Sequence, residues 1–348
     1  MLTQKVDQND DLLGVYHEWI KRLAERVDRL SVICLYRGQY SLPSNVRVYS
    51  LGKESGLSKW KYLKNFYKYI WQLRQEYDLV FVHMNTEYIL LGWWLWKRLR
   101  KKIVLFFAHY NPDWKLRFSE KVVDRIVTSV PEACNIPSRK ITVVGQGIDT
   151  ERFRYMGVKK KERSILFLGR ISPVKNIDTL LDAFERVAQT DNSISLGIVG
   201  SAPLADQEYL KGILVRIKAS QVSSRIHYYG GVPNHQTPEI YNYYELFINL
   251  TPTGSFDKSI LESMACETPV LVSNKAFVRI FPSQLRSRLM FGEGDSEELS
   301  NKIQEFFQLP QAEVSKAKSF LREIVVHNYS LDHLPIALCK AFEQILYA

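Results

Sequence analysis

The sequence contains few cysteines, and they lie far apart. Cys34, Cys134, Cys266 and Cys339 form no Cys-x-x-Cys pair, so their spacing indicates neither a zinc site nor a disulfide framework. Disulfide frameworks belong to oxidising compartments, whereas unpaired thiols are typical of a reducing one. The cysteine pattern therefore favours a cytoplasmic protein.

Long apolar runs are also absent. No stretch reaches the roughly 20 consecutive apolar residues that a membrane-spanning helix needs. Tyr88–Trp96 is apolar throughout but is only nine residues long. The first residues lack the layout of a signal peptide. Any contact with a membrane is therefore expected to be peripheral, on the inner face of the plasma membrane.

Several common catalytic motifs are missing too. The sequence has no P-loop, no His-Glu-x-x-His and no arrangement typical of a Ser/His/Asp triad. Motifs of nucleotide-hydrolysing P-loop proteins, zinc proteases and serine hydrolases therefore do not account for this chain.

The pattern that is present indicates an α/β protein. The 348 residues, 46% apolar and 24% charged, suffice for two globular domains with separate cores. Buried strands alternate with helices, which predicts doubly wound parallel sheets. A polar segment around Lys159-Lys160-Lys161 is expected to link the domains. We expect one domain over 1–152, a second over 153–328, and a terminal helix in 329–348.

Almost all of the net positive charge lies in the first half of the chain. The net charge is +10, and residues 1–150 carry 24 Lys and Arg against 15 Asp and Glu, a net of +9. This half is therefore expected to face an acidic partner or an anionic surface.

Two predicted helices in this half interleave cations with aromatic residues. Residues 57–77 contain KWKYLKNFYKYIWQLR, and residues 93–102 are WWLWKRLRKK. Three interpretations stay open: aromatics buried in the core, docking on an anionic membrane surface, or nucleic-acid binding. Two such helices in one half favour the membrane interpretation over nucleic acid, and we expect no nucleic-acid partner.

Two histidines follow predicted buried strands of the first half. His83 ends the strand over 78–82, and His109 follows the strand over 103–107. The carboxyl ends of parallel strands are where open α/β sheets bind ligands. A single histidine is usually structural, but two at equivalent strand ends fit a functional role equally well.

A phosphate-binding pattern opens the second half. The strand Ser164–Leu168 is followed by Gly169-Arg170, then by Lys175, and then by a helix over 177–188. A glycine, two cations and a helix start within one loop can cradle a pyrophosphate. The alternative is a basic loop without a ligand.

The stretch Thr253–Val272 predicts a loop, a helix, a turn and a strand. Gly254 and Ser255 are expected to supply turn geometry, and Asp257 to cap the helix. Glu262 lies between apolar neighbours near the helix start. It is either a solvated helix residue or a carboxylate that binds sugar hydroxyls beside an anion-binding helix N-terminus.

This stretch resembles the signature of glycosyltransferase family 4, a large retaining family with the GT-B fold, written E-G-F-G-x-x-x-L-E-A-M-A-x-G-x-P-V. Among the positions that depart from it, Gly254 replaces the first glutamate, and Glu267 replaces a glycine. The spacing G-R-x4-K-N after Leu168 also matches the family's donor-diphosphate motif. The residues that match the signature are Phe256, Leu261, Glu262, Met264, Ala265, Pro269 and Val270.

The resemblance covers almost the whole chain. It implies two Rossmann-like, doubly wound domains facing a central cleft, with the last helix returning to the first domain. It implies retaining hexosyl transfer from a UDP- or GDP-sugar to a sugar or lipid-linked acceptor, with no cofactor. Asp-x-Asp, the metal-binding pair of the other large glycosyltransferase fold, does not occur. We therefore expect transfer without a metal, with protein cations stabilising the leaving diphosphate.

The resemblance also assigns site residues. His83, Arg170 and Lys175 are the expected catalytic residues, and His83 and His109 are the candidates on the acceptor side. Gly14 matches the second glycine of a family pair whose first member is missing. The residues expected to bind the donor are Gly14, Gly169, Arg170, Lys175, Val232, Pro233, Lys258, Ser259, Ile260, Leu261 and Glu262.

Two features leave alternatives open. Gly254 removes a carboxylate that the family places against the transferred sugar, which either shifts sugar preference or weakens the enzyme. A catalytically silent GT-B protein with a nucleotide-binding or regulatory role is therefore an alternative, and a nucleic-acid-binding protein is a more distant one.

Residues 1–4 leave almost no room for a first strand, and we expect a late start codon or a trimmed strand.

Overall fold

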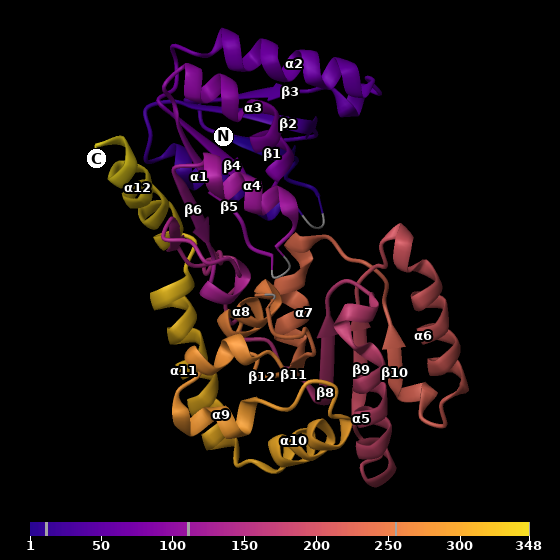
Figure 1. The fold of residues 1–348 in the computed structure, drawn as a ribbon. Coiled ribbons are helices and arrows are strands. Elements are labelled where there is room, and N and C mark those ends of the chain that lie inside the picture. The colour runs from indigo at the N-terminus through magenta and orange to yellow at the C-terminus, as the bar shows by residue number, and fades with distance from the viewer. Residues whose placement is uncertain (11–12, 110–111, 255, 348) are drawn as a thin grey trace. The chain divides into compact units, whose positions relative to one another are not determined.

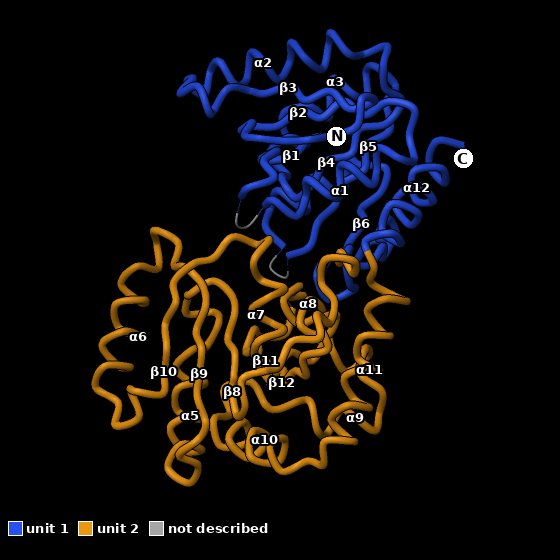
Figure 2. The backbone as a smooth tube through the Cα atoms, turned by 180° about the vertical axis from the view of Figure 1, so that it is seen from behind, with its two compact units in different colours: residues 1–147, 331–348 blue, residues 148–330 orange. Residues whose placement is uncertain are grey.

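The computed structural model of the protein describes residues 1–10, 13–109, 112–254 and 256–347. Its chain divides into two compact units, which Figure 2 colours separately. The domain boundaries expected at 152 and 328 lie a few residues from the observed divisions. Unit 1 comprises residues 1–147 and 331–348, and unit 2 comprises residues 148–330.

Unit 1 is built on one parallel sheet. Its described strands are β1 (Leu2–Val6), β2 (Leu30–Arg37), β3 (Val46–Ser50), β4 (Leu79–His83), β5 (Lys102–Phe106), β6 (Arg125–Thr128) and β7 (Ile141–Val143). Their order is β3-β2-β1-β4-β5-β6-β7. The chain starts near the centre, runs to one edge and then to the other, which is the order of a doubly wound sheet.

Helices cover both faces of this sheet (Figure 1). Successive strand residues point to opposite faces, so Val80 and Val82 enter one core and Phe81 enters the other. The first core is closed by α2 (Lys59–Gln72), α3 (Thr86–Arg98) and α4 (Trp114–Val122). The second is closed by α1 (Val15–Ala24) and α12 (His333–Leu346), so the last helix belongs to unit 1.

The first strand is present, and the expectation that residues 1–4 leave almost no room for it is wrong. β1 pairs with β2 on one side and with β4 on the other. Leu2 and Val6 are buried, while Lys5 pairs with Asp10 at 2.6 Å. The sequence concealed this strand because a lysine with a nearby carboxylate interrupts its apolar pattern.

Unit 2 is built on a second parallel sheet. Its described strands are β8 (Lys161–Leu168), β9 (Ser195–Val199), β10 (Ile226–Tyr228), β11 (Tyr244–Asn249) and β12 (Val270–Val272). Their order is β10-β9-β8-β11-β12, and every pairing is parallel. The carboxyl ends of the strands, and the loops that follow them, therefore lie at one edge of the sheet.

The helices of unit 2 pack by amphipathic faces. α5 (Ile177–Thr190) buries Leu180, Leu181 and Phe184 at helical spacing in the unit 2 core, beside α10 (Ser296–Gln308). The other α-helices described are α6 (Gln207–Ala219), α7 (Thr237–Tyr243), α8 (Lys258–Ala265), α9 (Ser283–Leu289) and α11 (Gln311–Tyr329).

The prediction of an α/β protein with two doubly wound parallel sheets is confirmed. Among the described residues, no helix is both long enough and apolar enough to span a membrane.

Candidate functional site

The loops after β8 and β9 meet at the carboxyl edge of the unit 2 sheet. Gly200 follows β9 with a φ of 148°, and a Cβ there would lie 1.8 Å from the Gly169 carbonyl oxygen. Only glycine allows two backbones to approach so closely in this conformation. The Ile171 N–H donates to the Ser201 carbonyl at 3.0 Å, which fixes the loop that carries Arg170.

Arg170 and Lys175 lie in this same loop but in different surroundings. Arg170 is exposed, and no ion pair of its guanidinium is found within the described residues. A short 3-10 helix, Pro173–Lys175, and a left-handed Asn176 with φ 48° then lead into α5. This tight turn leaves Lys175 buried, with an exposed fraction of 8%.

The Lys175 ammonium group joins three segments of unit 2. It donates to the Thr251 hydroxyl at 2.8 Å and to the Asp257 carboxylate. Thr251 lies just after β11, and Asp257 is the N-cap residue of α8. A cation from the β8 loop is therefore held against the start of α8, whose first backbone N–H groups lack partners within the helix.

Asp257 is the centre of this cluster. Its Oδ2 accepts hydrogen bonds from Asn249 at 3.0 Å and from Thr251 at 2.9 Å, and its Oδ1 accepts from the Ser259 N–H at 3.2 Å. The predicted helix cap is thus confirmed, whereas Ser255 lies outside the described residues. Burial would raise the Asp257 pKa, but the charge of Lys175 and these hydrogen bonds outweigh burial and hold that pKa well below its ordinary value.

Glu262 is buried further along α8, with an exposed fraction of 7%. Its Oε2 accepts a hydrogen bond from the Tyr241 hydroxyl at 3.2 Å. Burial raises the pKa of Glu262 to about 6, although the charges of Lys258 and Arg152 act in the opposite direction. The interpretation of Glu262 as a solvated helix residue is therefore wrong. The chain keeps a carboxylate in a place where ionisation is costly.

The other residues expected to bind the donor contribute in different ways. Ile260 and Leu261 are fully buried, so neither exposes its side chain to a ligand. The Ser259 hydroxyl donates to Asp257 Oδ1 at 2.9 Å. Val232 and Pro233 lie in a partly exposed loop after β10. Loops after β8, β9, β10 and β11 thus all contribute to this edge of unit 2.

In unit 1, His83 ends β4 among aromatic rings. Its ring centroid lies 4.1 Å from that of Tyr16, 5.6 Å from that of Trp19 and 5.4 Å from that of Phe106. Its Nδ1 lies 3.4 Å from the Thr3 hydroxyl oxygen. The imidazole, with an exposed fraction of 3%, is therefore held in a fixed orientation.

Gly14 and His109 belong to the same edge of unit 1 as His83. Gly14 precedes α1 in the connection after β1, and a Cβ there would lie 2.5 Å from the Asp10 carbonyl oxygen. His109 is exposed after β5. Because β1, β4 and β5 are neighbours in a parallel sheet, the segments that carry the three predicted residues leave it at one edge.

Three contributors were missed from the sequence: Asn249, Thr251 and Tyr241. For Thr251 a signal was available, because Asn249 and Thr251 introduce alternate polar residues at the end of an apolar strand. For Tyr241 no such signal was available, because its hydroxyl reaches Glu262 only through the packing of α7 against α8.

Within the described ranges there is no cluster of three or more His, Cys, Asp and Glu suited to a metal, and Cys34, Cys134, Cys266 and Cys339 are free thiols.

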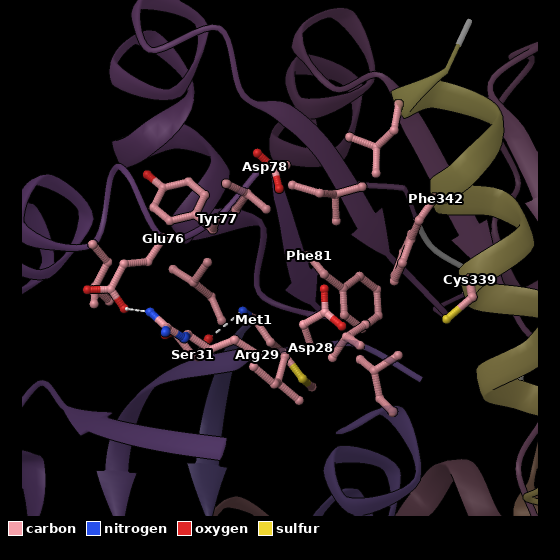
Figure 3. Close-up of a pocket in the computed structure, with 18 of the residues that line it drawn as sticks. Met1, Asp28, Arg29, Ser31, Glu76, Tyr77, Asp78, Phe81, Cys339 and Phe342 are labelled. Carbon is pink, nitrogen blue, oxygen red and sulfur yellow. Dashed lines mark hydrogen bonds and ion pairs between the residues drawn. The ribbon is translucent and has the colours of Figure 1, made fainter. Parts of the chain in front are cut away.

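A cavity of about 450 Å³ lies at the opposite edge of the unit 1 sheet, where the strands begin (Figure 3). The Met1 amino group donates to the Ser31 carbonyl at 2.7 Å, and burial lowers the pKa of that amino group to about 5. Arg29 and Glu76 pair at 2.7 Å on its lining. None of the predicted site residues lines this cavity, so we do not assign it to the reaction.

Comparison with known proteins finds one family. A family model described as glycosyl transferases group 1 matches residues 148–323, just over half of the 348 residues. The match lies in unit 2 and contains Arg170, Lys175, Asp257 and Glu262.

Curated relatives are matched over part of their length. An alpha-monoglucosyldiacylglycerol synthase of Streptococcus pneumoniae is 20% identical over 264 residues, 64% of this chain and 58% of the relative. A D-inositol 3-phosphate glycosyltransferase of Segniliparus rotundus is 28% identical over 144 residues, 39% of this chain and 32% of the relative. The chain thus spans less than two thirds of the length of these relatives.

Solved structures match over the whole chain. Anabaena Alr3699/HepE in complex with UDP has a TM-score of 0.77 at 16% identity, over 99% of this chain and 100% of that one. The same protein was solved with UDP-glucose. At this identity the similarity establishes a shared fold.

Proposed function

Because the chain belongs to the glycosyl transferases group 1, we propose that it transfers a sugar from a nucleotide-diphosphate sugar to an acceptor. The observation that supports this best is the cluster at the carboxyl edge of the unit 2 sheet. There Lys175 is held at the start of α8, in the loop that also carries the exposed Arg170. Two cations and a helix N-terminus are suited to a diphosphate.

The donor that we propose is a UDP-sugar, with a GDP-sugar as the second choice. The support is that the similarly folded Alr3699/HepE was solved with UDP and with UDP-glucose. In this proposal Arg170 and Lys175 offset the negative charge that grows on the diphosphate as its bond to the sugar breaks. The transfer retains configuration, moves a hexose and needs neither a metal ion nor a cofactor.

For the acceptor we propose a sugar or a lipid-linked glycan of the cell envelope, on the cytoplasmic side. Similarity to an alpha-monoglucosyldiacylglycerol synthase supports the lipid-linked choice. His83 and His109 lie at strand ends of unit 1 and are the proposed acceptor-side residues. The buried imidazole of His83 would orient an acceptor hydroxyl.

A second candidate function is nucleotide binding without transfer. Two observations favour it. Asp257 neutralises one of the two cations of the cluster, and Gly254 stands where the family signature has a glutamate.

Hydrolysis of UDP-glucose, measured as released UDP, tests the proposal without knowledge of the acceptor. Arg170→Ala should lower this rate by about 100-fold or more, because one charge-stabilising donor is typically worth ~3–4 kcal/mol. Its circular dichroism should be unchanged, since the side chain is exposed. Equal rates of UDP release by the wild-type protein and Arg170→Ala would show that Arg170 does not act on the diphosphate. A wild-type protein that binds UDP but turns over no donor would favour the second candidate.

A further inference from the structure

The helix α2 presents aromatic rings and lysines on one exposed side. Trp60, Tyr67 and Trp71 are spaced by seven and four residues, which places them on one face of the helix. The exposed fraction is 81% for Trp60 and 52% for Trp71. Lys64 and Lys68 lie beside this row and are exposed too. Figures 1 and 2 both draw α2 on the outside of unit 1.

The opposite side of α2 supplies the core. Phe66 and Ile70 are almost fully buried, in the core that α2 shares with α3. The interpretation of the aromatic residues as core therefore accounts for Phe66, but it leaves Trp60 and Trp71 unexplained. Large aromatic side chains exposed along one face of a helix are typical of an interaction surface.

The helix α3 extends the exposed row. The Tyr67 hydroxyl donates to the Leu91 carbonyl at 2.8 Å, and the Tyr67 ring centroid lies 6.0 Å from that of Trp94. Leu91 is 37% exposed and Trp94 is 48% exposed. We call this surface the tryptophan–lysine face. It consists of Trp60, Lys64, Lys68 and Trp71 of α2 with Leu91 and Trp94 of α3.

The charge of this face has one sign. The sequence holds no acidic residue between Glu54 and Glu76, while α2 carries four lysines. No ion pair of these lysines is found in the described ranges. Their charges are therefore available to an anionic partner.

The second basic-aromatic segment behaves differently, and the sequence-based prediction for it needs correction. The helix α3 ends at Arg98 rather than at 102, and Trp96 is buried. Lys97 pairs with Asp124 at 3.2 Å, and the Lys101 ammonium group donates to the Tyr77 carbonyl. Most of the surface therefore comes from α2.

We propose that the tryptophan–lysine face docks on an anionic lipid bilayer. Indole rings favour the headgroup region, where their apolar body is buried and their N–H stays hydrated. Lysines beside them are attracted to acidic headgroups. A helix with aromatics on one side and lysines next to them lies in the plane of such an interface. A nucleic acid would attract the lysines and stack on the indoles, but it offers no apolar layer for Leu91.

Co-sedimentation with vesicles tests this docking. Wild-type protein should pellet with vesicles of phosphatidylcholine and phosphatidylglycerol at low salt. It should bind less at high salt, because mobile ions screen the lysines. It should stay in the supernatant with phosphatidylcholine alone.

Two pairs of variants identify the face. Lys64→Glu with Lys68→Glu should lower the bound fraction about tenfold or more. Lys218→Glu with Lys316→Glu, which makes the same charge change at exposed positions of unit 2, should leave it unchanged. Trp60→Ala with Trp71→Ala should also lower binding. Its matched control is Trp114→Ala, which removes a tryptophan that is 66% exposed outside the face.

All variants should keep the wild-type circular dichroism and the wild-type response to UDP, so a loss of fold or of the nucleotide site is recognised separately. Wild-type protein that stays in the supernatant with anionic vesicles at low salt overturns the proposal. Equal binding to neutral vesicles, or wild-type binding by the face variants, overturns it as well. Retention on RNA or DNA without vesicle binding would assign the face to nucleic acid instead.

Discussion

At Glu262 a carboxylate occupies a site where burial raises its pKa from 4.5 to about 6. The folded chain therefore holds this proton more tightly than the unfolded chain does. The resulting cost to stability is absent below pH about 4.5, grows between the two pKa values and is complete above pH about 6. A shift of this size corresponds to ~2 kcal/mol.

Replacing Glu262 by glutamine removes this cost. Glu262→Gln should raise the free energy of unfolding by ~2 kcal/mol at neutral pH and change it little near pH 4, because the amide oxygen can still accept the Tyr241 hydrogen bond. Denaturant titrations at the two pH values measure this. The same variant should bind a UDP-sugar more weakly. A carboxylate can accept hydrogen bonds from two sugar hydroxyl groups through its two oxygens, whereas an amide has only one acceptor oxygen. A gain of stability that is equal at both pH values would contradict the assigned pKa shift.

The Asp257 carboxylate pairs with the Lys175 ammonium group, and an anionic ligand of the cluster would compete with it for that cation. Asp257→Asn keeps a helix cap and removes one negative charge. Because the Asp257 pKa is lowered, its stabilising contribution is present above its ordinary pKa and is lost in acid. The variant should therefore be less stable than wild type at neutral pH, with a smaller difference in acid.

The same Asp257→Asn variant should bind UDP several-fold more tightly, because a carboxylate next to the diphosphate position is gone. Calorimetric titration measures the change. Asp257→Ala serves as a comparison, because it loses the helix cap in addition, typically ~1 kcal/mol. An unchanged UDP affinity in the asparagine variant would mean that Lys175 does not meet the diphosphate.

At the scale of elements, the turn after β9 depends on Gly200. A Cβ there would lie 1.8 Å from the Gly169 carbonyl oxygen, in the left-handed region of backbone space. Gly200→Ala should lower the melting temperature and weaken UDP binding together, because the β8 loop carrying Arg170 must shift. Gly212→Ala is the matched control. It lies in α6 with open space around it, and alanine there should stabilise the helix by up to about 1 kcal/mol. Normal UDP binding by Gly200→Ala would contradict the role of this turn.

Elements with a strong local pattern were predictable, and those governed by distant contacts were not. The apolar spacing of α5 and the turn chemistry before α8 gave both helices within a few residues. The end of α3 was misplaced, because Arg100 takes a left-handed conformation with φ 55° and Lys102 already begins β5. No local pattern specifies that a chain will leave a helix so that the next strand can join its sheet.

At the scale of the molecule, the sequence indicated the loop of the candidate site better than the contacts that hold that loop. The spacing of Gly169, Arg170 and Lys175 predicted that they share one loop after a strand, and the three residues do follow β8. Contacts across long separations, such as those of Lys175 with Thr251 and Asp257, appear only once the strands are ordered in the sheet. The aromatic residues of the first half had three open interpretations. The structure divides them, because Phe66 and Trp96 enter the core while Trp60 and Trp71 stay exposed.

The central claim is that the carboxyl edge of unit 2 binds the diphosphate of a nucleotide sugar. Thermal shift with UDP-, GDP- and ADP-glucose tests it most directly, because a ligand of the folded state raises the melting temperature by mass action. Wild-type protein and Arg186→Ala, an exposed arginine of α5, should respond alike to UDP-glucose. Arg170→Ala should need at least about tenfold more ligand for the same shift. No shift with any donor, or an Arg170→Ala response equal to that of wild type, would contradict the claim.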